Sequence, residues 1–302
     1  MKILVVGGTG MIGGHAALHL QSLGHDVSIA GRNPAQSKVQ LARLPFIQGD
    51  YIAGSFTPEQ LAPFDAIIFA AGHDVRHIPE GGSYDEHVVK SNAHGVPAFA
   101  ALAKAAGVKH FIHVGSFYPH IMPEAVETNA YIGARKAATD GIAKLADDSF
   151  HVVSVDAPFV VGTVPGMSIP MFEYYTSYAQ GFVEIPPFGP AGGSVFISCQ
   201  SLSEAITGAL ERGENGKAYL VGDESLSFAD YFKLFFRAAG NDVEVPSLDQ
   251  EHPMLPDSAI LTGRGRVVSY EPDAEEAKTL AYRRNDIKRA VEEIVAQYRS
   301  AA

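Results

Sequence analysis

The sequence predicts an α/β protein with a doubly wound parallel sheet and a smaller domain toward the C-terminus. Its first residues have the pattern of a short apolar strand, a glycine-rich turn and a helix. Short apolar runs then alternate with helical patterns roughly every 20 to 35 residues, as expected for a parallel sheet. After Pro158 the composition changes, and residues 163–195 are rich in proline, glycine and aromatic side chains. This change indicates that a second domain begins there.

The N-terminal segment has the order strand, glycine turn, helix. Residues 2–6 (KILVV) are typical of a strand that is buried on both faces. Gly7, Gly10 and Gly13 follow in the spacing G-x-x-G-x-x-G, and apolar residues then recur every three or four positions up to Leu23. In this context the glycines allow a tight turn and a close approach to a pyrophosphate, which faces the helix N-terminus. The segment therefore predicts a dinucleotide site; the alternative is a glycine-rich loop that binds nothing.

The end of the second predicted strand distinguishes between the two nicotinamide dinucleotides. Residues 26–30 form this strand and Arg32 follows it, with no Asp or Glu from Ile29 to Pro34. At this position an acidic residue accepts a hydrogen bond from the ribose 2′-hydroxyl of NAD, whereas an arginine suits the 2′-phosphate of NADP. We therefore expect NADP rather than NAD; the alternative is that Arg32 is a solvated residue of a surface loop.

The residues expected around the cofactor come from the glycine turn and from the ends of the next strands, where Asp50 and several small residues stand. They are Gly7, Thr9, Gly10, Met11, Ile12, Gly13, Arg32, Asp50, Ala70, Ala71 and Gly72.

The alternation of strands and helices continues along the chain. Further strands are predicted at 46–50, 65–72, 109–116, 150–156, 196–197 and 217–221. Helices are predicted at 84–106, 130–146, 203–212, 228–239 and 285–299. We assign residues 1–162, completed by about 196–222, to a dinucleotide-binding domain, and residues 163–195 and 223–302 to a substrate domain.

The composition excludes several classes of partner. Of 302 residues, 46% are apolar and 19% are charged, as in ordinary globular proteins, and the formal net charge is -11. Nucleic acids and anionic membranes need a basic face, so neither is an expected partner. The single cysteine, Cys199, excludes an intramolecular disulfide and a cysteine metal site, and we interpret the His and Asp residues at 73–77 as a loop rather than a metal site. Since the first strand starts at residue 2 and no apolar run could span a membrane, we expect a cytoplasmic protein that acts on a small molecule.

Several pieces of the chain carry a resemblance to a known family. They are residues 7–13 (GGTGMIG), 90–95 (KSNAHG), 100–116 (AALAKAAGVKHFIHVGS), Tyr131, 157–158 (AP) and 277–282 (AKTLAY). Together they resemble the extended short-chain dehydrogenases/reductases, which include nucleotide-sugar epimerases and dihydroflavonol-type reductases. The resemblance implies a Rossmann fold and an NAD(P)-dependent oxidoreductase or epimerase. It adds Pro158 to the cofactor-binding residues and leaves a homodimer open.

The resemblance also implies roles for individual residues. Tyr131 would donate or accept the proton at the reacting carbon, Ser116 would hydrogen-bond the substrate oxygen, and Asn92 would support the local helix and a water relay. These roles agree with the chemistry, because hydride transfer to a carbonyl leaves an alkoxide that needs a positioned acid. Substrate contacts are expected from residues that follow the fourth and fifth strands, which are His73, Phe117 and Tyr118.

The helix after Tyr131 departs from the family pattern. The lysine expected four residues after the tyrosine is Arg135, and Lys136 stands five residues away. On a helix, four residues bring a side chain to within roughly 40° of the tyrosine, while five leave it roughly 140° away. An arginine supplies charge but cannot relay a proton. Three interpretations are open: Arg135 replaces the lysine, a local bulge brings Lys136 in, or the site has lost catalysis.

The substrate is predicted by class. Relatives that act on nucleotide sugars usually carry an arginine shortly before the strand at 196–197. This chain has no basic residue between Gly181 and Val195, although Arg264 and Arg266 could compensate. We therefore predict an NADP-dependent oxidoreductase that acts on a small carbonyl compound or the matching alcohol. The alternatives are a nucleotide-sugar epimerase or dehydratase with bound NAD(P), and a non-catalytic NADP-binding regulator.

Overall fold

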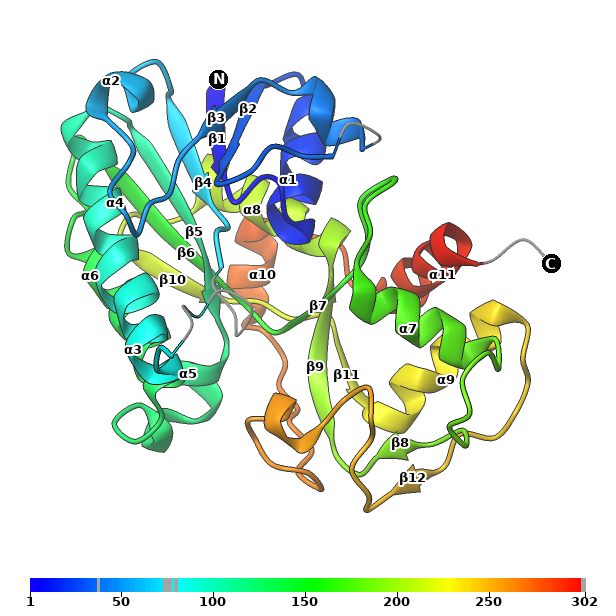
Figure 1. Cartoon of the computed structure of the whole chain (residues 1–302). Helices are drawn as coiled ribbons and strands as arrows, with labels where there is room; N and C mark the ends of the chain where they lie inside the picture. The colour runs from blue at the N-terminus through cyan, green and yellow to red at the C-terminus, as the bar shows by residue number, and fades with distance from the viewer. Residues whose placement is uncertain (37–38, 73–77, 79–80, 300–302) are drawn as a thin grey trace. The chain divides into compact units, whose positions relative to one another are not determined.

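The computed structural model describes residues 1–36, 39–72, 78 and 81–299 (Figure 1). The chain folds into two compact units, each assembled from separate segments. Unit 1 comprises Met1–Ala157, Leu202–Val221 and Pro272–Tyr282. Unit 2 comprises Pro158–Ser201, Gly222–Glu271 and Arg283–Ala302. The assignment of one part of the chain to the cofactor and another to the substrate stays a prediction.

Unit 1 contains a seven-stranded parallel sheet in the order β10-β6-β5-β4-β1-β2-β3. Its strands are β1 (Lys2–Val6), β2 (Asp26–Gly31), β3 (Phe46–Gln48), β4 (Ala66–Phe69), β5 (His110–Ser116), β6 (His151–Ala157) and β10 (Lys217–Leu220). The chain adds β2 and β3 on one side of β1, and then β4, β5, β6 and β10 on the other. This is the doubly wound arrangement, so the predicted fold class is confirmed.

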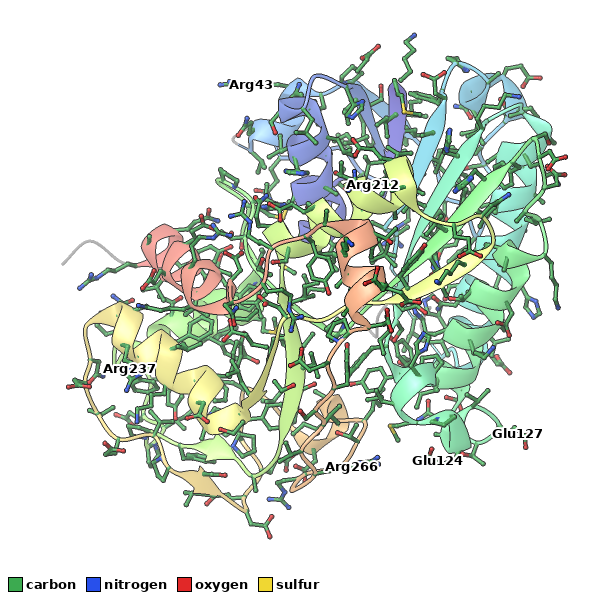
Figure 2. The ribbon with its side chains drawn as sticks, turned by 180° about the vertical axis from the view of Figure 1, so that it is seen from behind. Arg43, Glu124, Glu127, Arg212, Arg237 and Arg266 are labelled. Carbon is green, nitrogen blue, oxygen red and sulfur yellow. The ribbon has the colours of Figure 1, made fainter. Side chains whose placement is uncertain are left out.

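Helices cover both faces of this sheet, with α4 and α6 on one face and α1 and α8 on the other (Figure 1). The helices of unit 1 are α1 (Met11–Ser22), α2 (Pro58–Leu61), α3 (Tyr84–Val88), α4 (Gly95–Ala105), α5 (Tyr118–Ile121), α6 (Ala130–Ala143), most of α8 (Cys199–Arg212) and α10 (Ala274–Leu280). Arg212, which Figure 2 labels at the end of α8, donates from Nε to the Thr279 carbonyl oxygen at 2.8 Å. This bond ties α8 to α10.

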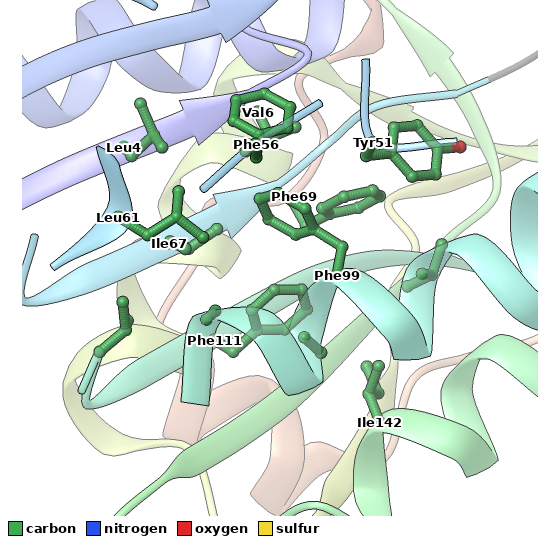
Figure 3. Packing of buried hydrophobic residues seen from close by; sticks show 14 of the residues in the cluster. Leu4, Val6, Tyr51, Phe56, Leu61, Ile67, Phe69, Phe99, Phe111 and Ile142 are labelled. Carbon is green, nitrogen blue, oxygen red and sulfur yellow. The ribbon is translucent and has the colours of Figure 1, made fainter. Parts of the chain in front are cut away.

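The core under α4 and α6 is built from the strands that the sequence marks as apolar on both faces. Leu4 of β1, Ile67 of β4 and Phe111 of β5 are fully buried there. Figure 3 shows Phe69 among the aromatic rings of this core, with its ring centroid 5.4 Å from that of Phe99 and 5.8 Å from that of Phe111. Large buried rings dominate the energy of such a core. They fix the strands whose carboxyl ends form the cavity described below.

The helix predicted over 84–106 is interrupted in the structure. In its place are α3, a π-helix at Val89–His94, and α4. Pro97 lies in the first turn of α4, where its missing N–H removes the bond that a continuous α-helix would make to residue 93. The apolar pattern therefore continues across a point at which the backbone changes its hydrogen-bonding register. π-helices often occur at functional sites, and this one carries Asn92.

The described part of unit 2 has a three-stranded mixed sheet and three α-helices. The sheet order is β11-β9-β7, from β7 (Phe159–Val161), β9 (Gly193–Ser198) and β11 (Glu224–Ser227), and the short strands β8 (Gly189–Pro190) and β12 (Ser247–Leu248) form a second pair. The helices are α7 (Pro170–Ala179), α9 (Phe228–Ala239) and α11 (Ile287–Tyr298). No helix among the described residues of either unit has both the length and the hydropathy needed to cross a membrane.

Aromatic side chains of α7 and α9 form the core of unit 2. Phe172, Tyr175 and Tyr178 are fully buried. The rings of Tyr175 and Phe232 meet almost at right angles, with centroids 5.0 Å apart. The aromatic cluster at 172–178 is therefore mainly a packing element, which the sequence pattern did not identify as a helix.

One histidine, His252, lies inside this aromatic core. Its ring centroid is 4.6 Å from that of Phe188 and 4.7 Å from that of Phe232. Its Nδ1 accepts a hydrogen bond from the Met254 N–H at 3.1 Å. Burial lowers the pKa of His252 to about 4, so the folded protein holds this side chain neutral at pH 7.

We expect this burial to make the protein less stable in acid. An unfolded histidine binds a proton near pH 6.5, whereas His252 in the folded protein does so near pH 4. The stability that neutral His252 supports is complete above pH 6.5 and falls by about 2 kcal/mol between pH 6.5 and pH 5. Urea unfolding at pH 7 and pH 5 should therefore show a larger loss in the wild type than in His252→Phe. Burial also lowers the pKa of His113, but this contribution is common to both proteins. Equal losses of unfolding free energy in the two proteins would contradict the lowered pKa of His252.

Candidate active site

A cavity of about 660 Å³ opens at the carboxyl edge of the sheet in unit 1. It lies at the ends of β1, β2 and β4, where the strand order reverses and where doubly wound sheets bind their ligands. Its lining residues all belong to unit 1. They are Val6, Gly7, Thr9, Gly10, Met11, Ile12, Gly13, Gly31, Arg32, Gly49, Asp50, Tyr51, Ala70, Ala71, Gly72, Tyr84, Asn92, Tyr131 and Arg135.

The glycine turn at one part of this cavity fits a pyrophosphate. Gly7 has a φ of +82°, and a Cβ there would lie 2.6 Å from the Ala71 backbone. A Cβ on Gly13 would overlap the carbonyl oxygen of Gly7, so α1 packs this close to the turn because residue 13 is glycine. At Gly10, by contrast, the nearest atom to an added Cβ is 3.4 Å away, and the protein leaves this space open. No acidic side chain lies in the first turn of α1, whose N–H groups suit an anion.

The end of β2 contributes a guanidinium and no carboxylate to the cavity. Arg32 is exposed, and its carbonyl oxygen accepts a hydrogen bond from Gln48 Nε2 at 3.0 Å, which holds the loop against β3. Asp50, after β3, also lines the cavity. Its Oδ1 accepts the N–H of Ile52 at 2.9 Å, so this carboxylate braces its own loop. The fit to a 2′-phosphate at this end therefore depends on Arg32.

Tyr131 and Arg135 line the same cavity from α6. This helix is a regular α-helix from Ala130 to Ala143, so the four-residue spacing places both side chains on one side of it. Lys136 points elsewhere, and its Nζ lies 2.7 Å from Asp140 Oδ1 at an exposed position. The geometry thus matches the interpretation in which Arg135 stands in place of the lysine, and it shows no bulge that would bring Lys136 into the cavity.

The guanidinium of Arg135 is held by two hydrogen bonds. Nη1 donates to Asn92 Oδ1 at 2.9 Å, and Nη2 donates to the Val114 carbonyl oxygen at 2.8 Å. Its Nε is buried and has no hydrogen-bond partner among the described residues. Asn92 is itself buried, and its Nδ2 donates to the Val88 carbonyl oxygen at 3.1 Å. The π-helix therefore presents an oriented amide to Arg135, which becomes a fixed cation on the same side of α6 as Tyr131.

Two further phenols belong to this region. The ring of Tyr118 in α5 stands nearly perpendicular to that of Tyr131, with centroids 6.1 Å apart. Burial, and to a smaller extent Tyr131, raise the pKa of Tyr118 above its usual value. Burial also raises the pKa of Tyr51, while the nearby Arg135 acts in the opposite direction. Both phenols therefore stay neutral at pH 7.

The structure brings together the predicted residues of the glycine turn and of the ends of β2, β3 and β4. Other predicted residues lie apart from the cavity. Ser116, the last residue of β5, and Phe117, which follows it, are buried and do not line the cavity, and Pro158 belongs to unit 2. His73 lies outside the described residues.

Tyr51 and Tyr84 also line the cavity, and no motif of the sequence points to them. Tyr51 could have been expected there because it directly follows Asp50, a predicted cavity residue. Tyr84 is marked only by its place as the first residue of α3.

Comparison with known proteins identifies the family. A model of the NAD dependent epimerase/dehydratase family matches residues 3–222. A search of the curated proteins finds no significant match. One similar solved structure is the NAD complex of the enzyme WbmG from Bordetella bronchiseptica, with 18% identity, 99% of this chain and 94% of that chain covered, and a TM-score of 0.75.

Two other similar structures carry enzyme names. The UDP-N-acetylglucosamine 4-epimerase from Bacillus cereus has 15% identity, covers 99% of this chain and 100% of its own, and has a TM-score of 0.73. TunA, an NAD-dependent NDP-hexosamine 5,6-dehydratase, has 16% identity, 100% and 98% coverage, and a TM-score of 0.73. At these identities the likeness shows a shared fold, and the resemblance to the extended short-chain dehydrogenases/reductases is confirmed. Because the family model matches most of the chain, this protein belongs to the NAD-dependent epimerase/dehydratase family and is an NAD(P)-dependent enzyme.

Proposed function

We propose that this chain exchanges hydride between NADP and a carbon that carries a hydroxyl or carbonyl group in a small molecule. The observation that carries the proposal is that Tyr131 and Arg135 line the same cavity as the glycine turn. When bound, the nicotinamide supplies or accepts the hydride. The protein side chains then manage the proton and the charge that accompany the transfer.

Tyr131 is the acid in the direction of reduction. Its phenol donates a proton to the substrate oxygen as negative charge develops there, and it accepts the proton in the opposite direction. Arg135 places a positive charge on the same side of α6 as the phenol, where it stabilises the negative charge that develops at the reacting oxygen. Asn92 and the Val114 carbonyl hold that charge in place. Because a guanidinium does not release a proton, Arg135 acts by its charge and not as a relay. The family resemblance assigns to Ser116 a hydrogen bond to the substrate oxygen, which would require the substrate to reach beyond the residues that line the cavity.

The choice of cofactor depends on Arg32. We expect NADPH to bind at least about tenfold more tightly than NADH, a difference of about 1.4 kcal/mol, because a guanidinium at the end of β2 attracts the 2′-phosphate. Fluorescence titration with both cofactors measures this. Arg32→Ala should remove most of the preference, and Arg32→Asp should reverse it.

A matched control is Arg43→Ala. Arg43, labelled in Figure 2, is an exposed arginine of unit 1 that does not line the cavity. The variant should keep the NADPH preference of the wild type. Equal affinities of the wild type for NADPH and NADH would overturn the phosphate assignment.

A second candidate is an epimerase or dehydratase that acts on a nucleotide sugar. The family match supports it, and so do the reactions in the names of the Bacillus cereus and TunA enzymes. Such an enzyme keeps its cofactor through the cycle and returns it to the starting redox state, whereas a reductase exchanges its cofactor at each turnover.

The purified protein tests the two functions against each other. We expect it to lose cofactor on gel filtration and to oxidise NADPH with a small aldehyde or ketone. Retained oxidised cofactor, together with conversion of UDP-glucose or UDP-N-acetylglucosamine without net redox change, would support the second candidate. Binding of NADPH without turnover of either class of compound would indicate a regulator.

A further inference from the structure

Four polar side chains form a chain of hydrogen bonds from the core of unit 1 toward its surface. The Nδ1 of His113 in β5 is 3.1 Å from the Oγ of Ser154 in β6. The Ser154 hydroxyl donates to Asp156 Oδ1 at 2.6 Å, and Asp156 Oδ2 lies 2.6 Å from Nε2 of His120 in α5. The proposed function uses none of these four residues.

Asp156 is a buried carboxylate for which the fold makes room. The residue is 2% exposed and lies opposite Gly115 in the β5–β6 register. A Cβ on Gly115 would overlap Asp156 Oδ1, so the glycine before Ser116 is needed for this carboxylate. A buried carboxylate is strongly unfavourable unless hydrogen bonds and a cation compensate it. Among the described residues, His120 is the basic side chain within ion-pair distance of Asp156; it compensates the carboxylate by a hydrogen bond, and by charge as well when the imidazole is protonated.

The hydrogen bonds in this chain have a defined direction. Burial lowers the pKa of His113 well below its usual range, and the nearby Arg135 lowers it to a smaller extent, so the inner histidine stays neutral. Its Nδ1–H donates to Ser154, because the Ser154 hydroxyl hydrogen is already directed at Asp156. The charge of Asp156 is therefore compensated from the outer side, where His120 donates its Nε2–H. This bond selects the tautomer of His120 and leaves Nδ1 as the position that can take up a proton.

His120 lies at the same edge of the sheet as the proposed acid. It stands four residues after Ser116, on the helix α5 whose Tyr118 ring lies against that of Tyr131, and His120 itself does not line the cavity. The His120 side chain is 35% exposed, whereas that of Asp156 is 3% exposed. An accessible imidazole oriented by a buried carboxylate is an arrangement that suits a general acid or base. We propose that His120, oriented by Asp156, is a second proton-exchanging residue of this active site, in addition to Tyr131.

This inference rests on the proposed function and supplies a proton transfer that Arg135 cannot perform. A substrate O–H or C–H bond breaks, its electron pair stays on the substrate, and the proton moves to Nδ1 of neutral His120. The imidazolium that forms is paired with the Asp156 carboxylate and returns the proton to the product or to water. No electrons are gained or lost in this step, so it requires no further reactant.

The first test compares variants of His120 in turnover. His120→Gln should lower kcat about 100-fold with the compound that the wild type converts, while the Kd for NADPH stays within about twofold. His120→Ala should regain activity when imidazole is added, which a purely structural role would not produce. The control is His25→Gln, which changes a half-buried histidine immediately before β2 and should leave kcat unchanged.

The second test does not depend on turnover. Diethyl pyrocarbonate acylates accessible neutral imidazoles, and mass spectrometry identifies the modified residue. We expect rapid modification of His120 and no modification of His113, which is buried. Asp156→Asn should change the modification rate of His120 at least about fivefold, because it removes the carboxylate that accepts Nε2–H and orients the imidazole.

The two tests separate the failure of the inference from the failure of the proposed function. If the wild type converts none of the aldehydes, ketones or UDP-sugars, the proposed function fails. The modification rates still decide whether Asp156 orients an accessible His120. An unmodified His120, or equal rates in the wild type and Asp156→Asn, overturns the inference. Wild-type kcat in His120→Gln overturns it as well, whatever the modification rates are.

Discussion

Tyr131→Phe is expected to lower kcat at least about 100-fold and to leave the Kd for NADPH within about twofold of the wild type. Phenylalanine keeps the ring and its perpendicular packing on Tyr118, and it removes the hydroxyl that we assign as the proton donor. Steady-state rates give kcat, and fluorescence titration gives the affinity for the cofactor. A fully active variant would remove Tyr131 from the mechanism.

Arg135 and Lys136, the two basic residues that follow Tyr131 on α6, test which side chain supplies the positive charge in the cavity. Arg135→Ala removes the cation and leaves Asn92 Oδ1 and the Val114 carbonyl without their donor, so both kcat and the affinity for NADPH should fall. Lys136→Ala is the matched control one residue away. It breaks an exposed pair with Asp140 and should keep both quantities within about twofold. An active Arg135→Ala together with an inactive Lys136→Ala would show that the helix rearranges to bring the lysine in.

Gly13→Ala is expected to destabilise the protein by about 3 kcal/mol. The added Cβ overlaps the carbonyl oxygen of Gly7, which is a backbone atom and can move only if α1 separates from the turn. Gly10→Ala, three residues earlier, should fold normally, because the nearest atom to its Cβ is 3.4 Å away and its φ of -94° suits any residue. Its methyl group instead occupies the space that we assign to the pyrophosphate.

Urea unfolding and NADPH titration distinguish the two glycine variants. The unfolding free energy of Gly10→Ala should stay within about 0.5 kcal/mol of the wild type. Its affinity for NADPH should fall at least about tenfold, or about 1.4 kcal/mol. Wild-type affinity in Gly10→Ala would show that the pyrophosphate lies elsewhere, and wild-type stability in Gly13→Ala would show that α1 shifts easily.

The sequence was sufficient to predict the sheet and the part of the cavity near the glycine turn, because their requirements are local. The strand Lys2–Val6 is marked by its apolar run. The glycine spacing is required by close contacts within one turn, such as that of Gly13 with the Gly7 carbonyl oxygen. The end of β2 is likewise identified by the residues next to it, so Arg32 could be placed in the cavity before the structure was known.

Features that depend on distant residues could not be predicted. Arg135 meets Asn92 across 43 residues, and the π-helix that orients the amide interrupts an apolar pattern that looks regular. The pairing of His120 with Asp156 needs the β5–β6 register and the absence of a side chain at Gly115. In unit 2, aromatic and proline-rich composition concealed α7, whose stability comes from packing on α9 rather than from helix propensity.

The π-helix at Val89–His94 amounts to one extra residue inserted into a helical turn. One residue corresponds to a rotation of about 100° around the helix axis, so α3 and α4 are out of phase with each other. This offset lets α4 direct Phe99 into the core while Asn92 faces Arg135. In a single uninterrupted helix, the direction of Phe99 would fix the direction of Asn92. Because the π-helix separates the two directions, a substitution in the apolar face of α4 can alter the packing of the core without turning Asn92 away from the Arg135 guanidinium.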